Sequence, residues 1–322
     1  MFQMRYKMWI LASLILLGSC SMTGYSIYKP KTEQIAIEAH FCPEQNCHGI
    51  ISGMIKNATK TVHCAFYDLT MDDVREALVE KSRTADVKLV TDNDNPTDLP
   101  FAMTDNRNGL MHNKFCIIDS KTVITGSYNP TYGGLDDNNN VIIARSSSLA
   151  DNYESEFQEF QAGIFGKGNR VKNPVIYYEN GTKKIENYFC PEDWCSDKVL
   201  KALANANSSV NFMIFSFTDN SIGDLLVKKH SEGIDVKGVL EKSQNTNQYS
   251  EYQKLLDAGI NVTFDKNPKL LHHKVFIIDD EIVITGSYNP TSNGDKVNDE
   301  NILIIYDMDI AKQFLEEFDR VY

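Results

Sequence analysis

The sequence predicts an α/β protein made of two similar lobes. Three observations support this fold class. A polar phrase of fixed spacing occurs twice, beginning at His112 and at His272, an offset of 160 residues (272 minus 112). A short cysteine-bounded segment also occurs twice. Apolar residues at helical spacing alternate along the chain with short, wholly apolar runs, which are typical of strands covered on both faces.

The first lobe is expected to begin with a strand over residues 34–41. A helix over 49–60 should follow, because residues 50, 51, 54, 55 and 58 place apolar side chains on one helical face. A strand over 62–67 leads to Thr70, a cap-like start for a helix ending at Ser82, and then to a strand over 87–90. Residues 93–109 are polar and are expected to be a loop, either shaping the mouth of a pocket or lying plainly on the surface.

The second lobe repeats this order from about residue 184. It is expected to add a helix over 249–258 and a strand over 260–264, both lacking in the first lobe. Between the lobes, the Asn180-Gly181 pair is flanked by apolar residues 175–178, which predicts a linker ending in a hairpin. The expected domains are therefore 35–162 for the first lobe, 163–183 for the linker and 184–322 for the second lobe.

The repeated phrase collects groups suited to a phosphate. It reads His-x-Lys, four residues, Asp, six residues, Gly-Ser-Tyr-Asn. In an extended strand alternate side chains share a face, so the histidine and lysine of each copy point the same way. Cations and neutral donors offset the charge on phosphate oxygens. The candidate residues are His112, Lys114, Asp119, Ser127 and Asn129 in the first copy, and His272, Lys274, Asp279, Ser287 and Asn289 in the second.

Two histidines suggest a covalent mechanism. One can attack phosphorus as a neutral nucleophile while the other, protonated, donates to the leaving oxygen and later activates water. This chemistry requires no metal and no other cofactor. The alternative interpretation is that these side chains lie at the ends of strands without a catalytic role, but two copies at identical spacing argue against it.

At these residues the chain resembles the phospholipase D superfamily, whose HKD signature both halves match. The resemblance runs from about residue 35 to the C-terminus. It implies two lobes related by a pseudo-twofold axis, each a mixed β-sheet flanked by helices, with one active site at their interface. It also implies a phosphohistidine intermediate and a phosphodiester substrate. Both lobes lie in one chain, so a monomer with one shared site is expected.

Within that superfamily the local sequence is most similar to the small bacterial endonucleases and their mitochondrial relatives. The similarity lies in residues 215–218, 225–229, 233–236 and 298–301. The resemblance also implies that Glu300, before an apolar strand, orients a catalytic histidine; Asn139 holds the matching place in the first lobe. By resemblance to members with two motifs, His112 is expected to be the nucleophile and His272 the acid and base.

The net charge of the chain restricts the range of possible substrates only slightly. The net charge of −12 argues against a broad surface for polyanions, although the lysines and histidines can still make a local positive field. A nuclease acting on DNA or RNA outside the cytoplasm is expected first, from the local similarity to endonucleases. A phospholipase acting on phosphatidylcholine or cardiolipin head groups is the alternative. A non-catalytic binding protein is disfavoured by two intact motifs.

The N-terminus is expected to be a targeting segment. Arg5 and Lys7 precede an apolar run over residues 8–17, which suits a signal sequence. Residues 17–20 resemble a bacterial lipobox, in which Cys20 would be lipidated; an uncleaved anchor is the alternative. Residues 1–20 are thus a signal or anchor and 21–34 a tether. Either interpretation places the catalytic body outside the cytoplasm, tethered to the membrane or secreted.

Cysteine spacing fits that compartment. Cys42 and Cys47, like Cys190 and Cys195, would each close a short loop before the first helix of a lobe, and disulfides are expected there. Zinc is the competing interpretation, because His48 follows Cys47. The second copy has a serine at that place, so no metal is expected. Two further cysteines, Cys64 and Cys116, align with Phe212 and Phe276 and are expected to be buried packing thiols.

Overall fold

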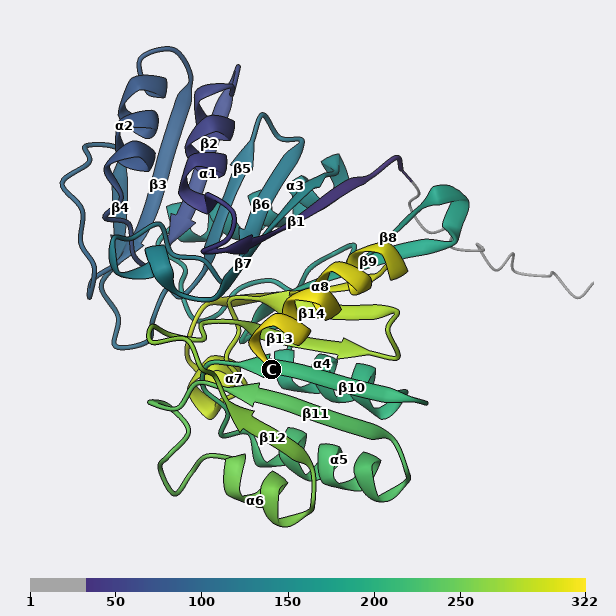
Figure 1. Cartoon of the computed structure of the whole chain (residues 1–322). Coiled ribbons are helices and arrows are strands. Elements are labelled where there is room, and N and C mark those ends of the chain that lie inside the picture. Colours follow the sequence, from purple (N-terminus) through teal and green to yellow (C-terminus); the bar gives the residue numbers. More distant parts are fainter. Residues whose placement is uncertain (1–32) are drawn as a thin grey trace, which may run out of the picture.

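The computed structural model describes residues 33–322 and forms two lobes, each with one mixed sheet (Figure 1). Both the α/β class and the two-lobed arrangement are therefore confirmed. The predicted signal segment, Cys20 and most of the predicted tether lie outside the described residues. Among residues 33–322, no helix is long and apolar enough to cross a membrane.

The first sheet has seven strands in the order β1-β7-β6-β5-β2-β3-β4. β2, β3 and β4 run parallel to one another, and the remaining neighbours are antiparallel. The strands are β1 Ala36–Cys42, β2 Thr61–Phe66, β3 Asp86–Asp92, β4 Ala102–Asp105, β5 Lys114–Ile118, β6 Thr122–Gly126 and β7 Asn139–Arg145.

The second sheet has eight strands in the order β12-β11-β10-β13-β14-β15-β9-β8. It repeats the first sheet, with β9 in the place of β1, and adds β8 at the edge as the first strand of the predicted hairpin. The strands are β8 Val175–Tyr178, β9 Lys183–Cys190, β10 Ser209–Ile214, β11 Asp235–Leu240, β12 Asn261–Phe264, β13 Lys274–Ile278, β14 Ile282–Gly286 and β15 Glu300–Tyr306.

Helices cover both faces of each sheet (Figure 1). α1 and α2 pack on the outer face of the first sheet, and α4, α5 and α6 on the outer face of the second. α3 and α8 contribute to a third core, which the inner faces of both sheets share. The helices are α1 Cys47–Lys56, α2 Asp72–Lys81, α3 Ser147–Gln161, α4 Cys195–Ala204, α5 Asn220–Ser231, α6 Tyr252–Asp257, α7 Ser292–Lys296 and α8 Met308–Val321, with 3-10 turns η1 Gly133–Asp136 and η2 Glu179–Gly181.

The first lobe keeps a strand that the sequence did not predict. Within residues 93–109, expected to be a loop, β4 pairs in parallel with β3 just as β12 pairs with β11. The strand is short and lies at the sheet edge, but Ala102 and Met103 pack on opposite cores, as alternation along a strand requires. Four residues are too few for such alternation to stand out in a polar segment. The first lobe thus lacks only the helix that corresponds to α6.

Three disulfides are present in the structure. Cys42–Cys47 and Cys190–Cys195 confirm the predicted pairs, each just before the first helix of a lobe. Cys64 and Cys116 form a third bond, so the prediction of packing thiols was wrong. Their strands are antiparallel neighbours, and register places the two residues directly opposite each other. Phe212 and Phe276 occupy the same paired positions in the second sheet, where ring contact replaces the bond.

Candidate active site

Two crossings between the lobes bring the repeated phrases together. Residues 111 and 299 form one parallel bridge, and residues 138 and 271 form the other. The backbone N–H of His112 donates to the carbonyl of Asp299 at 3.0 Å. The N–H of His272 donates to the carbonyl of Asn138 at 2.8 Å. Each of these histidines is thereby placed next to the start of a strand in the opposite lobe, β15 or β7.

The side-chain partners of the two histidines also come from the opposite lobes. Nδ1 of His112 lies 2.8 Å from Oε2 of Glu300. Nδ1 of His272 lies 2.9 Å from Oδ1 of Asn139 and 3.1 Å from the carbonyl oxygen of Ser127. A backbone carbonyl can only accept, so Nδ1 of His272 carries the hydrogen, and Nε2 of the neutral ring keeps its lone pair. His112 likewise directs Nδ1 at an oxygen, Oε2 of Glu300, so its hydrogen lies on Nδ1 and its Nε2 is unprotonated.

The two serines of the phrases hold these orienting groups. Oγ of Ser287 donates to Oε2 of Glu300 at 2.6 Å, and Oγ of Ser127 donates to Oδ1 of Asn139 at 2.9 Å. Both serine side chains are fully buried. Each lobe therefore fixes, through its own serine, the residue that orients the histidine of the other lobe.

The lysines stand beside the histidines, as the spacing predicted. Nζ of Lys114 donates to the carbonyl of His112 at 2.6 Å, and Nζ of Lys274 to that of His272 at 2.7 Å. An aromatic ring flanks each pair: Tyr67 contacts His112 and lies under the Lys114 ammonium, and Phe215 does the same in the second lobe. These rings limit access of water to the cations, which strengthens their field on a bound phosphate.

Burial sets the protonation of the site. It lowers the pKa of Lys114 to about 7 and that of Lys274 well below its usual value. It also lowers the pKa of both His112 and His272, and the nearby lysine charges add to the effect. Burial raises the pKa of Glu300 to about 8, while Lys114 opposes the shift. At neutral pH the imidazoles are thus mainly neutral, the form that a nucleophile requires.

A second pair of crossed contacts escaped the sequence interpretation. Nδ2 of Asn301 donates to Oδ1 of Asn113 at 2.7 Å, and Nδ2 of Asn140 lies 3.0 Å from Nδ1 of His273. On its other side His273 contacts Glu317 of α8 at 2.9 Å through Nε2. The sequence did contain a signal for these contacts, because an asparagine follows both Asn139 and Glu300. The residue that each asparagine contacts lies in the other lobe, which no local pattern in the sequence indicated. These contacts lock the residue between histidine and lysine in each phrase.

The structure does not bring Asp119 or Asp279 into the site. Both lie just past the far ends of β5 and β13, and the strands separate them from the histidines. The Asp119 carboxylate accepts the backbone N–H groups of residues 59–61, and that of Asp279 those of residues 207–209. Partial burial opposes ionisation, yet these donors bring the pKa of both carboxyls below the usual value. Their expected catalytic role is corrected to an anchoring role.

Asn129 and Asn289, unlike Ser127 and Ser287, do not hold the groups that orient the histidines. Neither side chain forms a hydrogen bond with a histidine, and the Oδ1 atom of each is buried without a hydrogen-bond partner among the described residues. Both are half-buried and follow the glycine-serine-tyrosine turn after β6 or β14. They stay predictions as groups that orient a substrate phosphate.

Comparison with known proteins identifies the family of the chain. The family model for the PLD-like domain of cardiolipin synthase matches residues 51–161 and 199–322. Phospholipase D of Rickettsia conorii is 32% identical over 140 residues, covering 44% of this chain and 70% of that protein. Human mitochondrial cardiolipin hydrolase is 34% identical over 125 residues, covering 39% of this chain and 50% of that protein.

One solved structure shows the same fold over both lobes. Phosphatidylserine synthase of Haemophilus influenzae Rd KW20 superposes with a TM-score of 0.64 at 12% identity, covering 89% of this chain and 85% of that one. The phospholipase D family member Nuc from Salmonella typhimurium is 31% identical, with a TM-score of 0.41, and covers 43% of this chain and 93% of that one. The first likeness covers both lobes and concerns the fold alone.

Proposed function

We propose that this chain, a phosphodiesterase that belongs to the phospholipase D superfamily, cleaves nucleic acid through a phosphohistidine formed on His112. The observation that carries the proposal is the crossed pairing of two histidines, His112 with Glu300 and His272 with Asn139, between two buried lysines. The paired groups are chemically different, an ionisable carboxyl group and an amide, so the two histidines suit different tasks.

His112 fits the nucleophile. Oε2 of Glu300 accepts the Nδ1 hydrogen, which fixes the direction of Nε2, and ionisation of Glu300 above its pKa of about 8 makes Nε2 more electron-rich. In the first step Nε2 bonds to phosphorus and the bond from phosphorus to the leaving oxygen breaks. The Nε2 proton of protonated His272 goes to that oxygen. In the second step His272 takes a proton from water, the water oxygen bonds to phosphorus, and the bond between phosphorus and His112 breaks.

The lysines and the aromatic rings around them supply electrostatic stabilisation of the phosphate in this mechanism. Lys114 and Lys274 approach the site from the two lobes, and the pKa of each histidine is lowered by the charges of both lysines. Their ammonium groups would therefore face the nonbridging oxygens of a phosphate held between the histidines. Charge that grows on those oxygens in the transition state is stabilised there without a metal ion.

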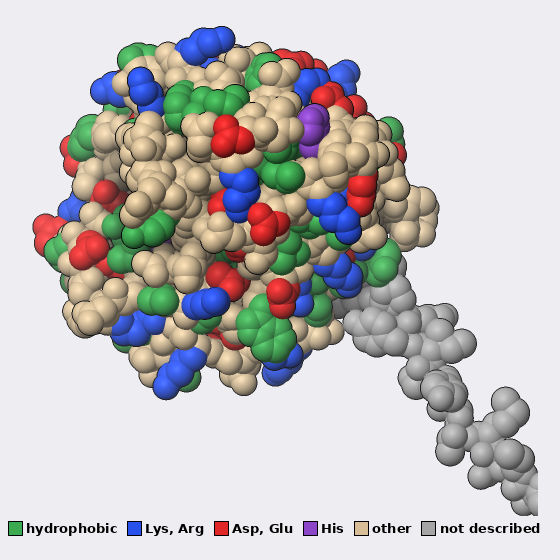
Figure 2. All heavy atoms as spheres, turned by 90° about the horizontal axis from the view of Figure 1, so that it is seen from below, with side chains coloured by type: hydrophobic (Ala, Val, Ile, Leu, Met, Phe, Trp, Pro, Cys, Tyr) green, Lys and Arg blue, Asp and Glu red, His purple; other side chains and the backbone are tan. Residues whose placement is uncertain are grey.

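The surface supports a soluble polymer as substrate. The exposed large apolar side chains among residues 33–322 come from separate elements and include Val79 on α2, Leu256 on α6 and Met308 on α8. Figure 2 shows one face, on which basic and acidic side chains are interspersed. A phospholipase working on a bilayer needs an apolar surface that enters the membrane around its site. The local similarity of residues 215–218 and 298–301 to endonucleases points the same way.

A phospholipid is the second candidate substrate. It is favoured by the relatives, which are a phospholipase D and a cardiolipin hydrolase. Both substrates present a phosphodiester to the same two histidines, so the site chemistry does not change between them. The difference lies in what surrounds the phosphate.

A comparison of substrates tests the proposal. The purified protein is incubated with single-stranded DNA, RNA, phosphatidylcholine vesicles and cardiolipin vesicles, each in excess chelator at room temperature. We expect cleavage of nucleic acid, loss of cleavage in His112→Asn, and normal cleavage in His40→Asn, which changes a histidine outside the site. Cleavage of vesicles alone would establish the second candidate. Loss of all activity in chelator, restored by one metal, would refute the histidine mechanism.

We also propose that the catalytic body works outside the cytoplasm, tethered through Cys20. Three disulfides support an oxidising compartment, where such bonds persist. Labelling of cells with a radioactive fatty acid should mark the wild-type protein and leave Cys20→Ser unmarked. Label on both proteins would contradict lipidation at that residue.

A further inference from the structure

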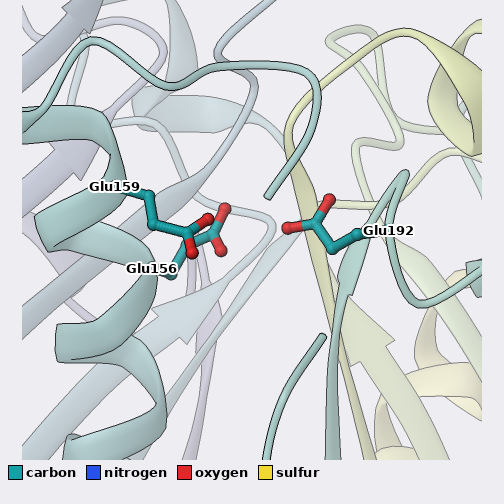
Figure 3. Close-up of side chains that lie close together, drawn as sticks. All are labelled: Glu156, Glu159 and Glu192. Carbon is teal, nitrogen blue, oxygen red and sulfur yellow. The ribbon is translucent and has the colours of Figure 1, made fainter. Parts of the chain in front are cut away.

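Three carboxylates meet where the two lobes join, away from the catalytic histidines. Glu156 and Glu159 lie three residues apart on α3 and so share one face of that helix. Glu192 belongs to the second lobe, in the loop that the Cys190–Cys195 disulfide closes before α4. Figure 3 shows the three side chains pointing toward one another. One oxygen of each lies within 4.8 Å of the other two.

Glu156 lacks the donor that a buried carboxylate needs. Its residue is only 4% exposed, and the side chain that meets it at hydrogen-bonding distance is that of Glu192, another acidic group. The nearest charges are those of Glu192, Asp299 and Glu159, all of the same sign. Buried carboxylates in mutual contact repel one another, so a cation between them is the natural partner.

Glu192 repeats this observation from the other lobe. Its Oε2 atom is buried and has no hydrogen-bond partner among the described residues. The backbone also passes close by: a Cβ atom at Gly168 would lie 1.9 Å from Oε2 of Glu159 and 3.1 Å from Oε1 of Glu192. A side chain at residue 168 would therefore have to displace the ends of these two glutamates. The carboxylates are thus enclosed on one side by the linker and fixed at both ends by α3 and the disulfide loop.

A cavity opens beside the cluster and gives a cation both access and water. Its volume is about 310 Å³, room for several water molecules, and Glu156 and Glu159 form part of its wall. Asn152 and Ser155, also from α3, contribute further oxygen atoms to the lining, which includes two basic residues of the linker, Arg170 and Lys172. Calcium takes six to eight oxygen ligands at about 2.3–2.6 Å and accepts irregular geometry with bound water. Oxygens on opposite sides of such an ion lie about 4.6–5.2 Å apart, consistent with the spacing here.

We propose that Glu156, Glu159 and Glu192 bind one hard divalent cation, calcium by preference, which ties α3 of the first lobe to the second lobe. The ion is structural, because none of the three carboxylates forms a hydrogen bond or ion pair with the histidines and lysines of the repeated phrases. The site is separate from the proposed catalysis, which needs no metal. Chelation should therefore lower thermal stability while leaving room-temperature turnover intact.

Thermal unfolding of the purified protein tests the site. In about 5 mM CaCl₂ the Tm should rise by at least about 4 °C over the value in chelator, because a ligand bound only by the folded state stabilises it. Glu156→Gln should abolish this rise. In chelator the same variant should unfold at or above the wild-type temperature, since it removes the unpaired charge. Glu192→Gln provides a second variant with the same expectation, in the other lobe.

Matched controls separate binding from general charge effects. Glu154→Gln changes a neighbouring carboxylate of α3 that pairs with His63 instead, and it should keep the full response to calcium. Terbium, used as a calcium probe, should show emission sensitised by Trp194, which lies two residues after Glu192, and Trp194→Phe should remove it. An unchanged wild-type Tm with calcium and with magnesium would overturn the proposal. So would a calcium response that survives in both Glu156→Gln and Glu192→Gln.

Discussion

Nδ1 of His112 in the first lobe lies 2.8 Å from Oε2 of Glu300 in the second lobe. The equivalent contact in the opposite direction joins His272 to an amide, Asn139, at 2.9 Å. Neither lobe therefore contains a complete catalytic unit. The exchange also makes the two histidines chemically unequal, because one faces a carboxylate and the other a neutral group.

This inequality predicts which histidine carries phosphate. Both His112→Asn and His272→Asn should reduce turnover by about a thousandfold or more, because nucleophile and acid fail together. Only His272→Asn should accumulate a phosphoprotein, most visibly on a substrate whose leaving group needs no proton. Intact-protein mass spectrometry after acid-free quenching measures the adduct. An adduct in His112→Asn alone would reverse the two roles, and near-normal turnover in either variant would refute a shared site.

The pH profile should report the acid, His272. Burial and the two lysine charges lower its pKa, so its protonated form is scarce at neutral pH and grows as pH falls. We expect kcat/KM on an ordinary diester to rise from about pH 8 toward pH 6. Asn139→Asp places a charge beside Nδ1 and should move this rise about 1–3 units higher. The control is an activated aryl diester, whose profile should not follow His272. An unchanged profile in Asn139→Asp on the ordinary diester would contradict the assignment.

The anchoring aspartates should affect stability and not chemistry. Asp279→Asn weakens charge-assisted bonds to three backbone N–H groups and should lower the free energy of unfolding by about 1–3 kcal/mol. Turnover per folded molecule should stay normal. Asp280→Asn changes the exposed neighbour and should leave both quantities nearly unchanged. A large loss of kcat in folded Asp279→Asn would restore its expected catalytic role.

The disulfides should differ in their contribution to stability. Cys64–Cys116 spans 52 residues and should contribute about 4 kcal/mol, whereas Cys42–Cys47 spans 5 and should contribute about 2 kcal/mol, by loop-closure entropy. Denaturant unfolding of the two paired Cys→Ala variants compares them. Peptide mapping by mass spectrometry without reduction should find all three bonds. Free thiols at Cys64 and Cys116 would contradict the third bond, and equal losses would contradict the entropic ranking.

Patterns within a few residues of each other carried most of the prediction. The strands β5 and β13 were evident because every position after the initial lysine is apolar, and the fixed spacing of the motif marked the histidines and lysines. The short cysteine loops were equally local, since five residues separate the partners. Repetition strengthened each signal, because the same spacing is unlikely to arise twice without a shared structure.

Contacts between distant segments were decided by the tertiary structure. The sequence identified Glu300 as an orienting group, but only the crossing of residues 111 and 299 assigned it to His112 of the other lobe. Strand register, not spacing, joined Cys64 to Cys116. The length of β5 removed Asp119 from the site although it belongs to the same motif. The sequence alone determined which chemical groups are present and how each lobe is built. The packing of one lobe on the other determined which groups act together, because partners 188 residues apart in the chain meet only across that interface.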